Sequence, residues 1–600
     1  MKAALRCARR DVDAEFIQTK SCSALAIAGA SIECDAMEDG GLSVVATGLP
    51  IWLDPKYQSI ASDTGTALAL AKAWQDLGRN LIDVVDNISF ALIDSNQAEA
   101  LIAIDRMASR AMCFTEPEDG SLVFATMTDC LGVYPGVDTK VNAQAVYDLM
   151  YFTRIPAPET IYQNCYKLLP AQYLHFSHGA TEVGRYWNMP YTDATRIDAT
   201  AVSRELREAV SAATNRSRGA VAEDRVGAFL SGGVDSSTIL GSLAACVDGP
   251  ASCFTMGFDV DGYDEMSFAR MAAAHFGANC HEYYVTADDV VDLISMLPKT
   301  YDEPFANTSV VPSYYCAKLA REHGVELLLA GDGGDELFAG NSRYGRQKIL
   351  DLYTRIPRWI RNGMIEPGLE HAPFRDSITL FRKGRSYVEQ ANMAMPERME
   401  AANYYSGRSA SEMFDDDFAA RVDIDGPIDL LREAYDRTSS ESLLHRMMHV
   451  DLQVILADDD LRKVGRMCET AGVAVGFPLL DPHVVKVAAQ IPAKQMMRGI
   501  QLRTFFKDAF KDFLPKSTLT KSKHGFGLPF GYWLREHGPL QEVAHAALFS
   551  LKDRGIYRVE FIDEVIQASR TGHASYHGEL VWVLMMLELW LQEHQSVTLR

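Results

Sequence analysis

After residue 200, short apolar segments alternate with segments of helical periodicity, and this alternation is the strongest constraint on the fold. It predicts strands at 225–230, 252–258, 281–285 and 325–330 and helices at 235–247, 268–276 and 310–323. Such a pattern is typical of α/β proteins in which helices cover both faces of a parallel sheet. Ligands of these sheets bind beyond the carboxyl ends of the strands. We therefore expect the functional residues directly after strands.

Before residue 190 the pattern is different. It contains three strand-like runs, at 90–93, 100–104 and 122–126. Apolar residues at helical spacing between Thr64 and Leu77 predict a helix that covers these strands. We expect two domains, residues 1–190 and residues 195–600, because the pattern changes between them.

Charge and hydropathy exclude several classes of protein. The chain has 58 Lys and Arg against 80 Asp and Glu, a net charge of −22, which disfavours general nucleic-acid binding. No apolar run reaches the ~20 residues of a membrane span, and arginines interrupt the first residues where a signal peptide would be apolar. Eleven scattered cysteines without a CxxC pair fit reduced thiols. We expect a cytoplasmic protein with no membrane span and no nucleic-acid partner.

The first motif with chemical meaning is Phe229-Leu-Ser-Gly-Gly-Val-Asp-Ser-Ser, at the end of a predicted strand. Gly232 and Gly233 permit a tight turn and close approach of a ligand, and the N–H groups of the helix start attract an anion. Hydroxyl donors are added by Ser231, Ser236 and Ser237. A carboxylate in such an anion site is explained if Asp235 holds Mg²⁺ that bridges phosphate oxygens. The spacing is not that of a Walker P-loop.

A second glycine-rich segment, Leu329-Ala-Gly-Asp-Gly-Gly-Asp-Glu, also follows a predicted strand. It places Asp332, Asp335 and Glu336 within five residues. Crowded carboxylates raise one another's pKa unless a cation compensates them, and Mg²⁺ would do so. The segment therefore predicts a metal site.

The third motif, Lys521-Ser-Lys-His-Gly-Phe-Gly-Leu-Pro, places lysines before a glycine-kinked apolar run. A lysine here can bring a positive charge to the mouth of a site. A surface lysine beside a packed aromatic turn has the same local pattern, so this motif alone decides little.

Together, and in this order, the three motifs resemble the synthetase domain of the asparagine synthetase B family. Further similar stretches begin at Ser62 (Ser-Asp-Thr), Ile155 (Ile-Pro-Ala-Pro-Glu-Thr-Ile-Tyr), Lys167 (Lys-Leu-Leu-Pro-Ala-Gln), Thr300 (Thr-Tyr-Asp-Glu-Pro-Phe), Phe477 (Phe-Pro-Leu-Leu-Asp) and Arg498 (Arg-Gly). The resemblance implies an N-terminal degenerate Ntn-hydrolase-like α+β sandwich domain. It also implies a C-terminal pyrophosphate-loop synthetase domain with a parallel sheet, of the adenine nucleotide α-hydrolase-like type.

The resemblance also implies the site residues. ATP would be bound by Leu230, Ser231, Gly232, Gly233, Asp235, Ser236, Ser237, Met256, Ala330 and Gly331. Asp235 and Asp335 would hold Mg²⁺. Asp332 would be the base that deprotonates the amine, with Glu336 also in the catalytic set, and Lys523 would stabilise the oxyanion or the departing phosphates. Lys521 is the alternative lysine.

The chain departs from the family at its start. Glutamine-dependent members begin Met-Cys-Gly, and the exposed cysteine attacks glutamine. Here the second residue is Lys2, and the nearest thiol, Cys7, is followed by Ala-Arg-Arg. We therefore expect no glutaminase activity, and an amine nucleophile that arrives as part of the substrate.

Relatives of this kind are β-lactam and carbapenam synthetases and lasso-peptide cyclases, which all close a ring through an adenylated carboxylate. β-Lactam synthetases carry Tyr where this chain has Asp332, and extra helical sequence at 345–450 suits a large peptide. We favour a lasso-peptide cyclase that acts on a precursor core peptide, with a leader protease and a leader-binding protein as expected partners. The alternatives are an ammonia-dependent asparagine synthetase, a β-lactam-type cyclase, a non-catalytic scaffold and a tRNA-modifying pyrophosphate-loop enzyme.

Overall fold

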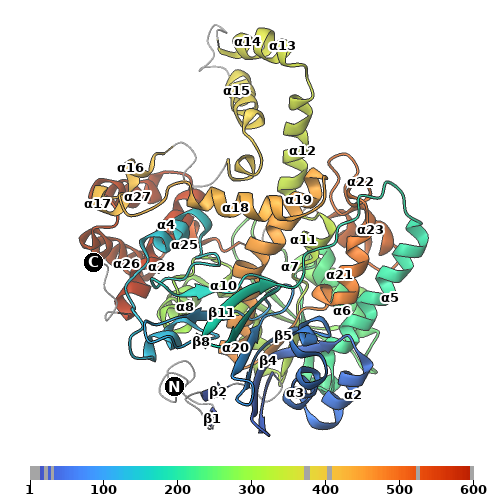
Figure 1. The fold of residues 1–600 in the computed structure, drawn as a ribbon. Helices are drawn as coiled ribbons and strands as arrows, with labels where there is room; N and C mark the ends of the chain where they lie inside the picture. The colour runs from blue at the N-terminus through green and yellow to red at the C-terminus, as the bar shows by residue number, and fades with distance from the viewer. Residues whose placement is uncertain are drawn as a thin grey trace.

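The computed structural model describes residues 14–18, 24–28, 33–370, 379–401, 408–521 and 527–594. Figure 1 shows a body built around two β-sheets and a helical arm that projects from it. Within the described ranges, no helix is long and apolar enough to cross a membrane. The expected catalytic Lys523 lies outside these ranges.

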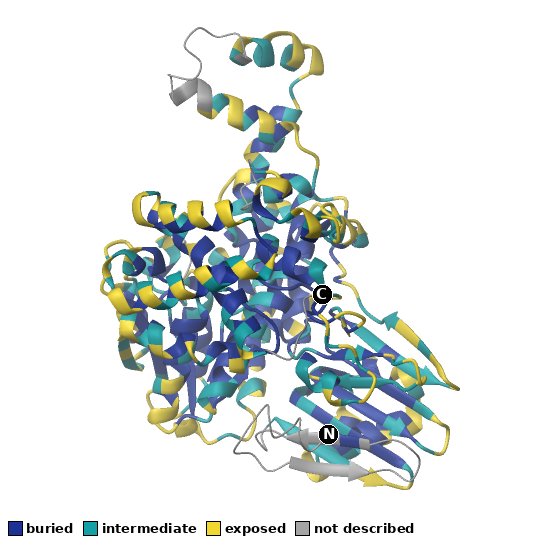
Figure 2. Ribbon diagram, turned by 90° about the vertical axis from the view of Figure 1, so that its left-hand side faces the viewer, coloured by how far each residue is buried: buried dark blue, intermediate teal, exposed yellow. Residues whose placement is uncertain are grey.

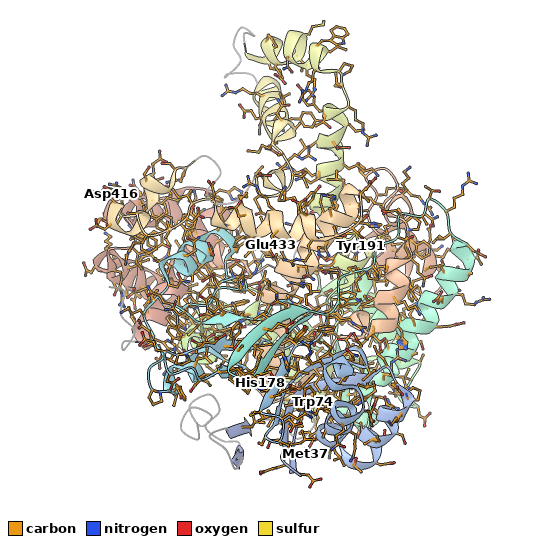
Figure 3. The ribbon with its side chains drawn as sticks, viewed as in Figure 1. Met37, Trp74, His178, Tyr191, Asp416 and Glu433 are labelled. Atoms are coloured by element: carbon orange, nitrogen blue, oxygen red, sulfur yellow. The ribbon has the colours of Figure 1, made fainter. Side chains whose placement is uncertain are left out.

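The N-terminal half is built on a six-stranded antiparallel sheet. Its strands in spatial order are β11 (Ala180–Arg185), β10 (Gln172–Ser177), β6 (Glu99–Ala103), β5 (Val85–Asp94), β4 (Leu42–Trp52) and β3 (Cys34–Asp39). Helix α3 (Thr66–Leu77) packs against β3 and β4, as its apolar spacing predicts. Trp74 of this helix is buried, and its indole N–H donates to the buried Asp94 carboxylate at 3.1 Å (Figure 3). This single contact fixes the helix to the far end of β5.

Smaller sheets lie beside this one. They contain β1 (Ala14–Gln18) with β2 (Ala24–Ala28), and β8 (Val123–Ala125), β7 (Cys113–Thr115) and β9 (Tyr166–Lys167). The predicted runs at 90–93, 100–104 and 122–126 are confirmed as parts of β5, β6 and β8.

The second half contains a five-stranded parallel sheet. Its strands in spatial order are β14 (Asn279–Val285), β13 (Ser252–Phe258), β12 (Val226–Phe229), β15 (Leu327–Leu329) and β16 (Ala474–Gly476). The first four are the strands that the sequence predicts, and the predicted α/β class is confirmed. The short strand β16 was not predicted from the sequence.

The order of the strands reverses at β12. The chain runs outward through β13 and β14, connected by α6 (Val234–Ala244) and α7 (Met266–Phe276). It then returns through α10 (Val310–Glu322) to place β15 on the other side of β12, with Ala228 opposite Leu329. This reversal is a topological switch point, where ligands of such sheets bind. The two glycine-rich motifs directly follow β12 and β15, so the fold brings them together.

Helices surround the parallel sheet. Those that matter for the site and its neighbours are α5 (Ala199–Arg218), α11 (Gly334–Phe338), α20 (Arg462–Ala471), α21 (Pro482–Ala489), α23 (Thr504–Ala509) and the π-helical segment η6 (Asp451–Leu461). The projecting arm consists of α12 (Ser342–Thr354), α13 (Arg358–Ile360), α14 (Glu366–Glu370) and α15 (Thr379–Asn392). Figure 2 shows that the arm is largely exposed, whereas the body is buried inside.

Candidate active site

The first glycine loop leaves β12 through Leu230, whose buried N–H donates to the Phe254 carbonyl at 2.9 Å. Gly232 has a φ of +70°, and a Cβ at this position would collide with the backbone of Phe268. Gly233 is the N-cap of α6, and no side chain caps that helix start in the described part of the chain. The first N–H groups of α6 can therefore bind an anionic ligand.

The three serines of this loop differ in their surroundings. The hydroxyl oxygens of Ser231 and Ser236 lie 3.0 Å apart, and the Ser231 N–H donates to the Ser236 hydroxyl at 3.2 Å. Ser237 is fully buried, and its hydroxyl has no hydrogen-bond partner among the described residues. Leaving a buried hydroxyl unsatisfied costs free energy. This orphaned group and the uncapped helix start fit a loop that accepts a polar ligand.

The second glycine loop leaves β15 through Ala330, whose N–H donates to the Gly476 carbonyl at 2.9 Å. A Cβ on Gly331 would lie 2.9 Å from the backbone of Asp235 and Ser236. A Cβ on Gly334 would collide with the Asp235 carboxylate. The glycines are needed because the two loops are in direct contact.

Arg503 connects the two predicted metal-binding carboxylates. Its guanidinium donates to Asp235 Oδ1 at 2.5 Å and also to Asp335 Oδ1. The residue has a φ of +56°, precedes α23 and is almost fully buried. Sequence reasoning missed Arg503, because no local pattern reveals a partner 268 positions away in the chain.

The site fits Mg²⁺ that arrives together with phosphates. Two carboxylates from different loops converge on one cation, which in this structure is the Arg503 guanidinium. Among the described residues there is no cluster of three or more His, Cys, Asp and Glu that could hold a metal. Mg²⁺ commonly takes one or two carboxylates and completes its shell with phosphate oxygens and water. Asp235 and Asp335 provide such a pair.

Two further carboxylates of the second loop have raised pKa values. Burial, reinforced by the charge of Asp460, raises the pKa of Asp332 to about 7. Burial and the same Asp460 raise the pKa of Glu336 to about 8. A carboxylate with a pKa near 7 suits general base catalysis at neutral pH. The expected cause was crowding among Asp332, Asp335 and Glu336; the raised pKa values instead come from burial and from the charges of Asp460 and Asp235.

Lys463 and Asp460 were not identified from the sequence. They stand at the junction of η6 and α20, where the Lys463 ammonium donates to Asp460 at 2.6 Å. Burial lowers the pKa of Lys463, but the charges of Asp460 and Asp332 outweigh it and raise the pKa above its ordinary value. Lys463 in turn opposes the rise in the Asp332 pKa. The run Asp-Asp-Asp-Leu-Arg-Lys at 458–463 was the signal available in the sequence.

Lys521 contacts the first glycine loop directly. Its ammonium donates to the Ser231 carbonyl and to Glu265, each at 2.9 Å. It also lies 5.0 Å from the centre of the Phe268 ring. These contacts hold the Lys521 side chain against the first glycine loop.

Met256, expected among the ATP-binding residues, is buried on β13.

Comparison with known proteins decides the family. The asparagine synthase model matches residues 205–592, which include both glycine loops and Arg503. The chain belongs to the asparagine synthase family. A glutamine amidotransferase domain model matches residues 53–187. As a member of this family, the protein is an ATP-dependent ligase that forms carbon–nitrogen bonds.

Individual relatives are distant. The putative glutamine-hydrolysing asparagine synthetase of Mycobacterium tuberculosis H37Rv is 26% identical over 555 residues, covering 90% of this chain and 81% of the relative. Asparagine synthetase 1 of Bacillus subtilis 168, also named as glutamine-hydrolysing, is 22% identical over 531 residues. This match covers 88% of this chain and 80% of the relative. An amidase of Penicillium rubens, chyE, is 26% identical over 42% of this chain and 39% of its own length.

Proposed function

We propose that the protein activates a carboxylate of a polypeptide with ATP and joins it to an amine of the same polypeptide, closing the macrolactam ring of a lasso peptide. The observation that carries this proposal is the convergence of Asp235 and Asp335 at the switch point of the parallel sheet. Two glycine loops whose carboxylates share one cation position are suited to bind the triphosphate of ATP together with Mg²⁺.

In the first step, a substrate carboxylate oxygen bonds to the α-phosphorus of ATP, and the bond from this phosphorus to pyrophosphate breaks. The residues Ser231, Gly232, Gly233 and Ser236 hold the phosphates through hydroxyl groups and the helix start. Asp235 and Asp335 would hold Mg²⁺, which when bound would supply positive charge to the leaving pyrophosphate. Arg503 must then exchange its present partners for the phosphates or move aside.

In the second step, the amine nitrogen attacks the activated acyl carbon, and the bond from this carbon to AMP breaks. The attacking amine must be neutral, so Asp332 accepts its proton. Glu336, whose pKa burial raises to about 8, is largely protonated at neutral pH and can donate a hydrogen bond. Lys523 stabilises the oxyanion of the tetrahedral intermediate.

Two described cysteines of the N-terminal half, Cys113 and Cys165, are poorly suited to act as the thiol nucleophile of a glutaminase. A thiol nucleophile needs a lowered pKa. Burial instead raises the pKa of Cys113 well above its ordinary value and that of Cys165 to about 11. We propose that this half serves in packing and peptide binding, and that the substrate itself provides the amine.

An intact-mass assay tests the proposal. The protein, Mg²⁺-ATP and a precursor peptide from its gene neighbourhood are combined with the leader protease and the leader-binding protein that we expect as partners. Loss of one water from the core peptide, with AMP and pyrophosphate formed in equal amounts, supports ring closure. AMP without loss of water from the peptide contradicts it.

The names of the relatives favour a second candidate, an asparagine synthetase. The same site residues would then activate free aspartate. Turnover of aspartate with ammonium but not with glutamine identifies the ammonia-dependent form. Asparagine formed from glutamine would overturn the proposal that glutaminase activity is lost.

A further inference from the structure

The projecting arm contains a groove between α12 and α15, with a volume of about 530 Å³. Its walls include Arg346 and Ile349 from α12 and Lys383 and Tyr387 from α15, and Ile500 lies at its base. The groove thus combines cationic, aromatic and aliphatic side chains. A concave surface of this composition is suited to a peptide that has both charged and apolar residues.

The arm differs in charge from the rest of the protein. Residues 342–392 contain ten Lys and Arg against five Asp and Glu, a net charge of +5, in a chain whose net charge is −22. A local positive field on an acidic protein attracts an anionic partner and rejects a cationic one. The charge of the arm therefore indicates an acidic ligand.

The cations of the groove are available for such a ligand. Arg346 is exposed and donates to the neutral Gln390 amide oxygen at 2.6 Å. Lys383 is exposed on the opposite helix. Within the described ranges, neither residue forms an ion pair with a carboxylate, whereas the nearby Arg343 pairs with Asp451.

Large apolar side chains on the arm are also exposed. Trp359 is 71% exposed and Leu352 is 56% exposed, and Ile349, Met364 and Ile500 are exposed as well. Figure 2 shows that much of the arm is exposed. Several exposed apolar residues on one small element are typical of an interaction surface. They offer apolar area to a partner that the basic residues attract.

The base of the groove adjoins the metal-binding carboxylates. Ile500 is three residues before Arg503, and Ser342, which also lines the groove, is two residues after Gly340. A Cβ on Gly340 would collide with both Arg503 and Asp335. A chain lying in the groove is therefore led to the point where its carboxylate would be activated.

We propose that the groove between α12 and α15 binds an acidic segment of the polypeptide substrate, one that also carries apolar residues. This inference rests on the proposed peptide-cyclising function and assigns the substrate's binding site outside the catalytic loops. A bilayer fits worse than a peptide, because the groove is concave and the whole chain is strongly acidic. A second copy of this chain is itself acidic and would also be attracted, so a dimer in solution that Arg346→Glu/Lys383→Glu dissociates would overturn the proposal.

Peptide binding to the intact protein tests the proposal without any catalysis. The probe is a fluorescein-labelled peptide of about 20 residues composed of Glu, Leu and Gly, which at about 3.3 Å per extended residue is longer than α12. Matched probes carry Lys for every Glu, or Ser for every Leu. Fluorescence anisotropy should show binding of the Glu–Leu peptide alone, weakened by salt.

The variant Arg346→Glu/Lys383→Glu should raise the Kd of this probe at least about tenfold, because two attractions become repulsions. The matched control, Lys72→Glu/Arg204→Glu, makes the same change of charge at exposed positions far from the arm and should leave the Kd unchanged. Equal weakening in both variants, or binding of the Lys–Leu peptide, overturns the proposal. So does binding to vesicles of phosphatidylcholine and phosphatidylglycerol in place of the peptide.

The same variants separate this inference from the proposed function. When turnover is measured with a precursor peptide that the parent protein cyclises, Arg346→Glu/Lys383→Glu should raise the KM for the peptide. The KM for ATP should stay unchanged. An unchanged peptide KM overturns the groove assignment while ring closure stands. Probe binding at the arm without ATP-dependent loss of water from any precursor leaves the groove in place and overturns the function.

Discussion

The ammonium nitrogen of Lys167 lies 2.9 Å from a carboxylate oxygen of Glu303, and both side chains are almost fully buried. Lys167 belongs to β9 in the N-terminal half, and Glu303 follows α9 (Leu297–Thr300) in the synthetase half. Arg462 donates to the same Glu303 at 2.5 Å and to Asp302 at 2.7 Å. The stretches that begin at Lys167 and Thr300 both resemble the family, although they lie far apart in the sequence. Their charged residues meet in one buried cluster that joins the two halves.

Replacing Lys167 by Met should destabilise the junction of the two halves. Removing one partner of a buried ion pair typically costs about 3–5 kcal/mol, and the loss here should lie toward the lower end because Arg462 still pairs with Glu303. The urea midpoint of unfolding should fall accordingly, measured by tryptophan fluorescence. Lys140→Met removes the exposed pair with Asp138 and should cost less than about 1 kcal/mol. Equal effects of the two substitutions would show that the buried pair has no special role.

Replacing Arg503 by Met should destabilise the protein chiefly when Mg²⁺ is absent. Charged hydrogen bonds of this kind contribute about 1.5–3 kcal/mol, and their loss leaves Asp235 and Asp335 facing each other. Mg²⁺ should restore much of the lost stability, because it binds the same carboxylates in the folded state. Urea unfolding with and without Mg²⁺ measures this. A loss that Mg²⁺ does not change, or one shared by the exposed control Lys511→Met, contradicts the prediction.

Much of the fold could be predicted because its signals are local. The strands β12, β13 and β15 are largely apolar runs, β14 is a more polar strand with two tyrosines, and the alternation of these strands with helices predicts the sheet type. The glycine loops could be placed at strand ends for the same reason. The strand order could not be predicted by periodicity, because pairing of Ala228 with Leu329 joins positions about a hundred residues apart.

The candidate site was only partly predictable. The glycine-rich motifs around Asp235, Asp332 and Asp335 identify these residues as candidate site residues. Arg503 does not stand out in this way, because no pattern around it reveals a partner 268 positions away. Lys463 lies in the charged run at 458–463, but that run does not show that folding brings its ammonium close enough to influence Asp332. Long-range electrostatic partners of this kind leave no spacing pattern in a single sequence.

Amide formation should require Asp332 in its ionised form. With a pKa of about 7, the rate should fall about tenfold for each pH unit below that value and level off above it. Asp332→Asn should abolish this dependence together with most of the activity. ATP–pyrophosphate exchange does not use the base, so its rate should not show this fall below pH 7. If the rate of amide formation in the Asn variant still falls below pH 7, the base is a group other than Asp332.

The raised pKa also predicts a stability change. The folded protein holds the Asp332 proton more tightly than the unfolded chain, whose ordinary value is 3.8, so stability falls as pH rises from about 4 to about 7. The Asn variant should lose less stability over this interval.

Replacing Lys463 by Met should move the acidic limb of the rate profile to higher pH. The ammonium of Lys463 opposes the effect of burial on Asp332, so its removal should raise the Asp332 pKa further. The measurement is the pH dependence of amide formation in the variant. The exposed Lys486→Met on α21 is the matched control and should leave the limb in place. An unchanged limb with a uniformly lower rate would give Lys463 a purely structural role.

Lys521 and Lys523 should have separable effects. Lys521 supports the first glycine loop through the Ser231 carbonyl and Glu265, so Lys521→Met should loosen the phosphate site. We expect the KM for ATP to rise by about tenfold, which corresponds to the loss of about 1.4 kcal/mol of binding. ATP–pyrophosphate exchange should weaken in parallel.

Lys523→Ala should give the opposite pattern, because its proposed charge acts on the oxyanion of amide formation. The KM for ATP should stay near the parent value, while kcat for amide formation falls by about 10²–10³-fold, as for other lost oxyanion donors. Circular dichroism of both variants should match the parent protein. If Lys521→Met lowers kcat with an unchanged KM and Lys523→Ala has no effect, the oxyanion role belongs to Lys521, and its contact with Ser231 must open during the reaction.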